Sequence, residues 1–179
     1  MSKVINLSKK KLNAIRSVLI CAVIAVMAII FALSADTADE SNNKSSPLSG
    51  SLLRAVLSVF DLSEEEMEEA THLCSYIVRK TAHFCEYALL GGLLFGLCTS
   101  FYLTRLKGII NSQIVGSLYA VSDEIHQYFV PGRSCQFSDM LLDSCGVFTG
   151  IMAILLILTI YIRIKSKKNQ KILQKVLDK

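Results

Sequence analysis

Residues 17–35 read SVLICAVIAVMAIIFALSA, a stretch of 19 residues without a charged side chain. Three more charge-free stretches follow, at 87–104, 108–122 and 144–162. A helix that crosses a bilayer needs roughly 20 mostly apolar residues. Four such stretches in a chain of 179 residues therefore predict a membrane protein. They exclude an ordinary soluble domain, a disordered chain and a small disulfide-rich protein.

The predicted fold class is an all-α, polytopic membrane helix bundle with four transmembrane helices. The spans cover about 17–34, 81–103, 108–130 and 140–162. The domains are a basic leader at 1–16, a transmembrane domain at 17–162 that includes an external loop at 35–80, and a basic tail at 163–179. Near the end of that loop, Ser63 and Glu66 form a capping box that predicts a helix start. The first span has the order of a signal peptide, but its long apolar run favours a retained anchor.

The net charge of +4 is unevenly distributed along the chain. Residues 1–16 carry five bases and no acid, and the tail from Arg163 carries seven bases and one acid. Arg105 and Lys107 lie in the short turn between the second and third spans. Because bases mark the cytoplasmic side of membrane proteins, we expect this turn and both termini in the cytoplasm. Basic ends can also bind nucleic acid, but their position beside apolar spans predicts no such partner.

Polar side chains gather at the outer ends of the last three predicted spans. Arg79, His83, Glu86 and Tyr87 share one helix face, because they are spaced i, i+4, i+7 and i+8. Charges at membrane depth are expensive unless they are paired or hydrated, so a cluster of them predicts a functional site. The predicted ligand-binding residues are Arg79, Lys80, His83, Glu86, Tyr87, Asp123, Glu124, Gln127, Arg133, Asp139 and Asp143.

Simpler interpretations exist for single members of this cluster. Glu86 and the adjacent Asp123 and Glu124 could be internal ion pairs that fix the helix order. Arg79 and Lys80 could be interfacial bases whose stems lie along apolar surface. Below the cluster, small residues at GxxxG spacing (Gly92 with Gly96, Gly146 with Gly150) predict close approach of helix backbones.

The six cysteines show neither a CxxC pair nor zinc-ligand spacing. Cys74 and Cys135 would both be external, so a disulfide between them is conceivable. The chain also has no P-loop, no GxSxG elbow and no HExxH motif. The sequence therefore predicts no cofactor and no metal site.

Two segments of the cluster resemble the paired motifs of VanZ-like membrane proteins. They are RKTAHFCEY at 79–87 and DEIHQYFVPGR at 123–133, the latter followed by Asp139 and Gly146. The resemblance covers roughly residues 15–162 and implies a multi-span protein of the bacterial plasma membrane. The family's named member is associated with teicoplanin resistance, a form of antibiotic resistance. Asp143 departs from the pattern, which has Asn there.

Three functions are compatible with these features. The first is binding or modulating a cell-envelope ligand at the outer leaflet, with membrane lipid, a lipid-linked cell-wall precursor or a lipoglycopeptide as partner. The second is a membrane-embedded enzyme that acts on an envelope lipid or glycan. Its acid–base candidates are His83, Glu86, Asp123 and Glu124, which could alternatively hold a divalent metal. The third is a small proton-coupled transporter, which a homodimer could build.

Overall fold

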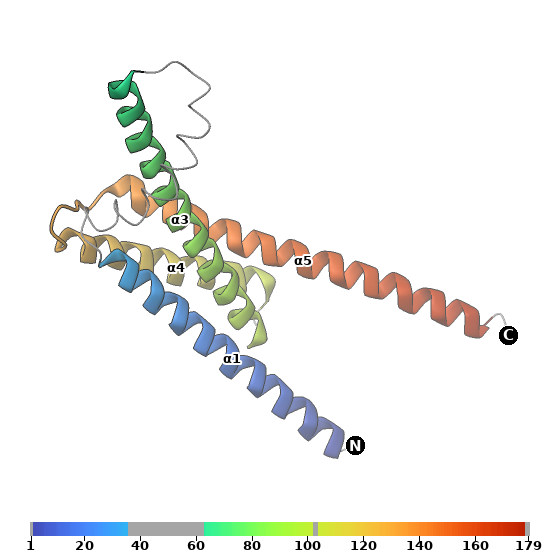
Figure 1. The fold of residues 1–179 in the computed structure, drawn as a ribbon. Helices are drawn as coiled ribbons and strands as arrows, with labels where there is room; N and C mark the ends of the chain where they lie inside the picture. Colours follow the sequence, from blue (N-terminus) through green and yellow to red (C-terminus); the bar gives the residue numbers. More distant parts are fainter. Residues whose placement is uncertain (1, 36–62, 102–103, 178–179) are drawn as a thin grey trace.

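The computed structural model of this chain describes residues 2–35, 63–101 and 104–177. These residues form the helices α1 (Ser2–Ser34), α3 (Glu64–Ser100), α4 (Arg105–Tyr128) and α5 (Phe137–Leu177). The prediction of an all-α bundle is confirmed. α3 contacts each of the other three helices. α1 and α4 run toward one end of the bundle, while α3 and α5 run back from it (Figure 1).

Three of these helices are long and apolar enough to cross a membrane. The segments are Lys9–Ser34, Glu64–Ser100 and Phe137–Gln170. α4 does not meet the same criterion of length and composition. The four-span topology and the cytoplasmic position of the termini stay predictions.

The two faces of α4 differ in composition. Its buried face carries small and polar residues: Gly108, Ser112, Gly116, Ala120, Asp123, Glu124 and Gln127. Its exposed face carries Ile110, Ile114, Leu118, Val121 and Ile125. Asp123, Glu124 and Gln127 therefore point into the protein, whereas Arg105, Lys107 and Asn111, which also lower the average hydropathy of this helix, are exposed. With 24 residues and a rise of about 1.5 Å per residue, α4 is about 36 Å long, longer than the roughly 30 Å bilayer core.

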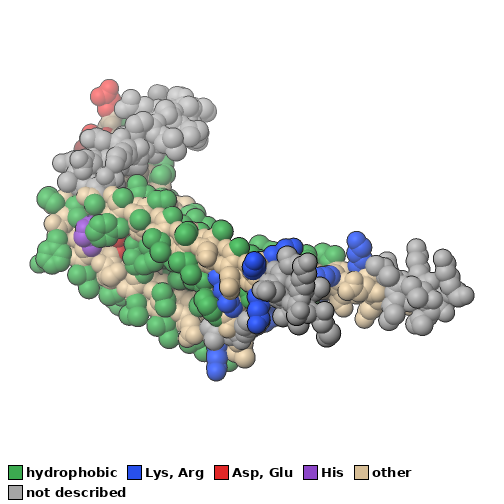
Figure 2. Space-filling model, turned by 90° about the horizontal axis from the view of Figure 1, so that it is seen from below, with side chains coloured by type: hydrophobic (Ala, Val, Ile, Leu, Met, Phe, Trp, Pro, Cys, Tyr) green, Lys and Arg blue, Asp and Glu red, His purple; other side chains and the backbone are tan. Residues whose placement is uncertain are grey.

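Apolar side chains dominate the molecular surface. Figure 2 shows them spread across the visible face, with Lys and Arg side chains gathered toward the end where α1 begins and α5 ends. Exposed examples on α1 are Val18, Ile24 and Phe31, and α5 exposes a run that includes Leu156 and Ile157. Soluble monomers rarely expose contiguous apolar surface of this extent. The surface is that of a membrane protein.

Several predicted boundaries differ from the structure. α3 begins at Glu64, where Ser63 N–H donates to Glu66 Oε2 at 2.9 Å and completes the predicted capping box. Residues 64–80 of the expected external segment at 35–80 are therefore helical, as the predicted helix start implies, and residues 36–62 lie outside the described part of the chain. α1 begins at Ser2 and α5 continues to Leu177, so the leader and the tail extend the spans as helix. Neither contains Pro or Gly to end the helix. The expected turn at Arg105 belongs to α4, which Thr104 caps by accepting from Lys107 N–H at 3.3 Å.

Glycines bring the backbones of α3 and α5 into contact. A methyl group at Gly150 would overlap with the carbonyl oxygen of Ala88, and one at Gly146 would lie 2.6 Å from that of Phe84. On α3, Gly91 lies equally close to the backbone of α5. The prediction for Gly146 and Gly150 is confirmed. On α3, a methyl group at Gly92 would lie 3.0 Å from Ile154 Cγ1 of α5, whereas one at Gly96 would meet only Leu19 Cδ2 of α1 at 3.8 Å. The tightest glycine of α3 is Gly91, so the helices cross more than one turn nearer the polar end than Gly96.

Candidate functional site

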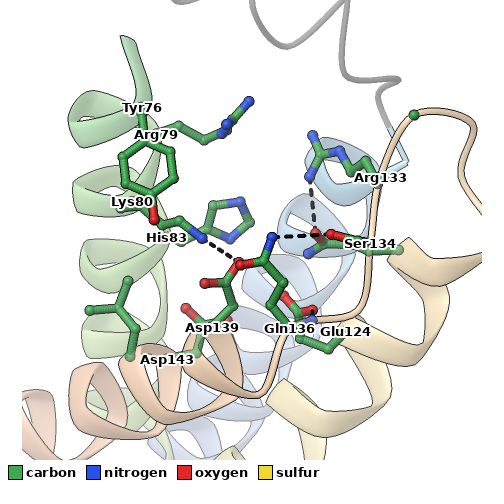
Figure 3. Close-up of a pocket in the computed structure, with 13 residues that line it drawn as sticks. Tyr76, Arg79, Lys80, His83, Glu124, Arg133, Ser134, Gln136, Asp139 and Asp143 are labelled. Carbon is green, nitrogen blue, oxygen red and sulfur yellow. Dashed lines mark hydrogen bonds and ion pairs between the residues drawn. The ribbon is translucent and has the colours of Figure 1, made fainter. Parts of the chain in front are cut away.

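A cavity of about 120 Å³ lies at the end of the bundle where α4 ends and α5 begins. Its walls come from α3, α4, α5 and the segment that joins α4 to α5. Most of the predicted site residues line it: Arg79, Lys80, His83, Glu124, Gln127, Arg133, Asp139 and Asp143. Figure 3 shows the bases of α3 facing Arg133 across the cavity, with the carboxylates of α5 and α4 below them. The helix ends thus gather residues that are up to 67 positions apart in sequence, as Tyr76 and Asp143 are.

Basic side chains border this cavity on two sides. Lys80 forms an ion pair with Asp139, which joins α3 to α5, and its Nζ lies 5.2 Å from the ring centre of Tyr76. Arg79 lies 6.0 Å from the same ring. Arg133 comes from the connecting segment, where Gly132 has a positive φ of 78° that favours glycine. This turn places Arg133 opposite the bases of α3.

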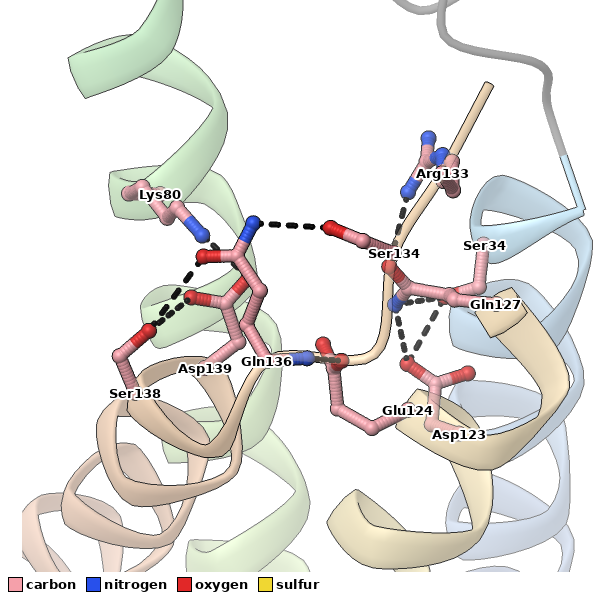
Figure 4. Close-up of polar contacts among 10 residues, drawn as sticks. All are labelled: Ser34, Lys80, Asp123, Glu124, Gln127, Arg133, Ser134, Gln136, Ser138 and Asp139. Carbon is pink, nitrogen blue, oxygen red and sulfur yellow. Dashed lines mark hydrogen bonds and ion pairs between the residues drawn. The ribbon is translucent and has the colours of Figure 1, made fainter. Parts of the chain in front are cut away.

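A chain of hydrogen bonds holds Arg133 to the ends of α1 and α4 (Figure 4). Ser34 Oγ donates to Asp123 Oδ2 at 2.8 Å, and Gln127 Nε2 donates to the same oxygen at 3.1 Å. Arg133 Nη1 donates to Gln127 Oε1 at 3.1 Å. Ser34, Asp123 and Gln127 are all buried. The chain therefore fixes one oxygen of Asp123 and orients the guanidinium group of Arg133.

A second contact fixes the start of α5. Gln136 N–H donates to Glu124 Oε2 at 3.0 Å, and Gln136 Nε2 donates to Ser134 Oγ at 3.1 Å. Glu124 is only 1% exposed. A buried carboxylate that accepts a backbone N–H at a helix start satisfies both the acid and the helix end. This contact sets the distance between α4 and the acidic residues of α5.

Two buried carboxylates keep oxygens without a hydrogen-bond partner among the described residues. Asp143 is 1% exposed and neither of its oxygens is paired, and Asp123 is 2% exposed with Oδ1 unpaired. One ligand atom of His83 lies within 4.8 Å of one oxygen of each. A buried charge without a partner is strongly unfavourable. These residues therefore require a proton, a cation or a bound group.

The sequence profile of the VanZ/LLP1 family matches residues 19–159. The chain belongs to the VanZ/LLP1 family. The match covers all four helices in part or in whole, and it confirms the resemblance carried by the two motifs. No curated protein and no solved structure matches this chain.

In this VanZ/LLP1 protein, three predicted site residues lie outside the cavity lining. Asp123 lies behind Gln127, to which it is hydrogen-bonded. Tyr87 is fully buried, with its ring 6.2 Å from that of Tyr119 and its hydroxyl unpaired among the described residues. Glu86 is half-buried on the adjoining surface of α3. His126, which is part of the second motif, stacks on Phe31 at 4.2 Å and so supports the α1–α4 contact.

Sequence reasoning missed other residues of the site. The cavity lining also includes Tyr76, Ser134, Gln136 and Leu142. Tyr76 lies three and four positions before Arg79 and Lys80, a helical spacing that could have placed it on the same face. Ser34 was not among the predicted site residues, because its contact with Asp123 spans 89 residues. All six cysteines are free, including Cys74 and Cys135.

Proposed function

We propose that this VanZ/LLP1 membrane protein binds the anionic headgroup of a cell-envelope amphiphile. Arg79, Lys80 and Arg133 around one cavity are the observation that supports it. The fork of an arginine suits two-point contact with phosphate or carboxylate, and a lysine adds a mobile positive charge. Because the outside of the bundle exposes apolar side chains, the acyl chain of such a ligand can stay in the surrounding lipid while its headgroup enters the cavity. The side-chain amides of Gln127 and Gln136 could form hydrogen bonds with sugar or peptide groups next to the anionic group of the ligand.

The proposed side of the membrane is the outer leaflet. The basic residues at the far end of α1 and α5 favour the cytoplasm, and α4 serves as the fourth span in this arrangement. The cavity at the opposite end then opens to the external face. Candidate ligands are a lipid-linked cell-wall precursor and a lipoglycopeptide such as teicoplanin, each of which combines a lipid chain with an anionic polar group. A role in resistance to the lipidated drug would follow from capture of either one.

Arg133 provides the sharpest test of this proposal. The full chain is purified in detergent and titrated with polyprenyl phosphate, as wild type and as Arg133→Gln. Loss of a charged hydrogen bond of about 1.5–3 kcal/mol should weaken binding roughly 10-fold to 100-fold. Arg163→Gln is the matched control, since Arg163 lies exposed on the distal part of α5. Equal affinity of wild type and Arg133→Gln would refute the headgroup contact.

A cellular experiment tests the proposed role in resistance. A deletion strain carrying each variant is exposed to teicoplanin and, in parallel, to vancomycin, which lacks the lipid chain. We expect wild type and Arg163→Gln to protect against teicoplanin only, and Arg133→Gln to lose that protection at equal membrane abundance. Protection by Arg133→Gln, or protection against neither drug by wild type, would contradict a resistance role.

A second candidate is an enzyme that acts on the same class of ligand. The observation in its favour is His83 beside Asp143 at the cavity wall, with Asp123 close behind, a set that could divide acid and base roles. Turnover of polyprenyl phosphate or a lipid-linked precursor by wild type, lost in His83→Gln, would favour catalysis. A transport path is less well supported, because apolar side chains fill the core below the site: Leu90, Phe95, Val147 and Ile151.

A further inference from the structure

We propose that His83, Asp123 and Asp143 form a binding site for a divalent transition-metal ion at the inner wall of the cavity. The sequence offered His83 and Asp123 only as alternative metal ligands together with Glu86 and Glu124, because the three residues come from α3, α4 and α5 and form no linear motif. In the folded chain, one ligand atom from each lies within 4.8 Å of the others. This inference is independent of the proposed headgroup binding and goes beyond it.

The geometry of the three groups suits a metal ion. Ligand atoms bind such ions at about 2.0–2.2 Å, so two ligands of one tetrahedrally coordinated ion lie about 3.4 Å apart. The three atoms lie within 4.8 Å of one another, so metal binding would draw the side chains together by up to about 1.4 Å. Imidazole nitrogen together with carboxylate oxygen favours ions such as Zn²⁺ or Mn²⁺ over Mg²⁺.

The unpaired oxygens of Asp143 are the second observation that indicates a cation. Asp143 is 1% exposed, and neither oxygen has a hydrogen-bond partner among the described residues. Asp123 Oδ1 is unpaired as well, whereas Oδ2 accepts from Ser34 and Gln127. One oxygen of Asp123 is thus fixed by hydrogen bonds and the other is left for a ligand. Metal sites commonly hold a ligating carboxylate in this manner.

The position of the site also leaves coordination open toward the cavity. His83 and Asp143 line the cavity, and Asp123 lies behind Gln127. Three protein ligands with a remaining position facing a cavity are typical of metal sites that contact a substrate. The other cavity acids have partners of their own: Asp139 pairs with Lys80, and Glu124 accepts from Gln136 N–H. A bound divalent ion would balance the two remaining carboxylates and add positive charge to a cavity already bordered by Arg79 and Arg133.

The test uses the full chain purified in detergent, with metal content measured by mass spectrometry. Metal is then removed with a chelator, and thermal stability is followed during titration with Zn²⁺ or Mn²⁺ alone. Because a ligand of the folded state raises its stability, wild type should show a saturable rise in Tm. Asp143→Asn and His83→Gln should each need at least about tenfold more metal for half of that rise. Glu69→Gln, which removes an exposed carboxylate near the start of α3 and outside the cavity lining, is the control and should keep the wild-type midpoint within about twofold.

A spectroscopic readout separates ligation from a structural role. Co²⁺ bound to wild type should give visible absorption bands that His83→Gln changes and Glu69→Gln leaves in place. Absence of any metal-dependent rise in Tm in wild type would overturn the proposal, as would equal midpoints in wild type and Asp143→Asn. If the two carboxylates share a proton instead, Asp143→Asn would match or exceed the stability of wild type with and without metal, which also overturns it. None of these outcomes depends on headgroup binding.

Discussion

Replacing Gly146 by alanine should push α5 away from α3 and destabilise the bundle. The new methyl group would lie 2.6 Å from the carbonyl oxygen of Phe84, where an ordinary contact begins at 3.4 Å. The obstacle is backbone, which cannot rotate aside as a side chain can. The helices must therefore separate at this point. Gly146 lies almost one helical turn after Asp143, so the same shift should also move Asp143 relative to His83.

The size of the effect follows from that distance. Relieving the overlap requires a separation of about 0.8 Å, and a gap of about 0.5–1 Å forfeits a quarter to a half of the dispersion energy of each facing atom pair. Overpacking of this kind costs about 1–3 kcal/mol. Alanine also favours the helix over glycine by about 1 kcal/mol. Gly96→Ala is the control for that gain, because the nearest atom there is Leu19 Cδ2 at 3.8 Å.

The assay compares the thermal unfolding of Gly146→Ala and Gly96→Ala in detergent. The gain in helix propensity is common to both variants, so the difference between them isolates packing. At about 2–4 °C per kcal/mol for a chain of this size, Gly146→Ala should melt roughly 2–12 °C below Gly96→Ala. Equal melting temperatures would refute the close contact of α3 and α5 at Gly146. A lower melting temperature for Gly96→Ala would place the closest contact of α3 at Gly96 instead of Gly91.

Two further predictions concern contacts between helices. Tyr119→Phe should lower the free energy of unfolding by about 0.5–1.5 kcal/mol, because the Tyr119 hydroxyl donates to the Met27 carbonyl oxygen at 2.6 Å. Thermal unfolding measures this loss. Tyr128→Phe, at an exposed position, is the control and should leave the melting temperature unchanged. Lys80→Met and Asp139→Asn should be non-additive, with a coupling energy of about 0.5–3 kcal/mol in a double-mutant cycle, since the two side chains form an ion pair between α3 and α5. Strict additivity would show that this ion pair contributes no stability.

The sequence determined the architecture because a membrane helix can be recognised from the hydropathy of its own segment. Long charge-free apolar runs predict membrane spans, and the helices α1, α3, α4 and α5 each contain all or most of one of the four runs. The capping box of Ser63 and Glu66 likewise placed a helix start by itself, because its hydrogen bonds join residues three apart. The two sequence motifs identified the family and contain most of the residues that line the cavity. The helices α1, α3 and α5 extend into the predicted leader, external segment and tail, because a helix can continue past the apolar run that predicts it.

Only the tertiary structure decided which of the polar residues act together. Ser34 and Asp123 meet across 89 residues, and no periodicity within one helix predicts a contact of that range. Helix rotation separated Glu86 from the cavity while it brought Asp143 to His83. The glycine contact that fixes this rotation involves Gly91, which is not part of the predicted GxxxG pairs.

The sequence alone therefore determined a membrane helix bundle with polar residues at one end, since hydropathy is a property of single segments. The cavity and the His83, Asp123 and Asp143 cluster required the packed bundle, because they depend on how three separate helices turn toward one another.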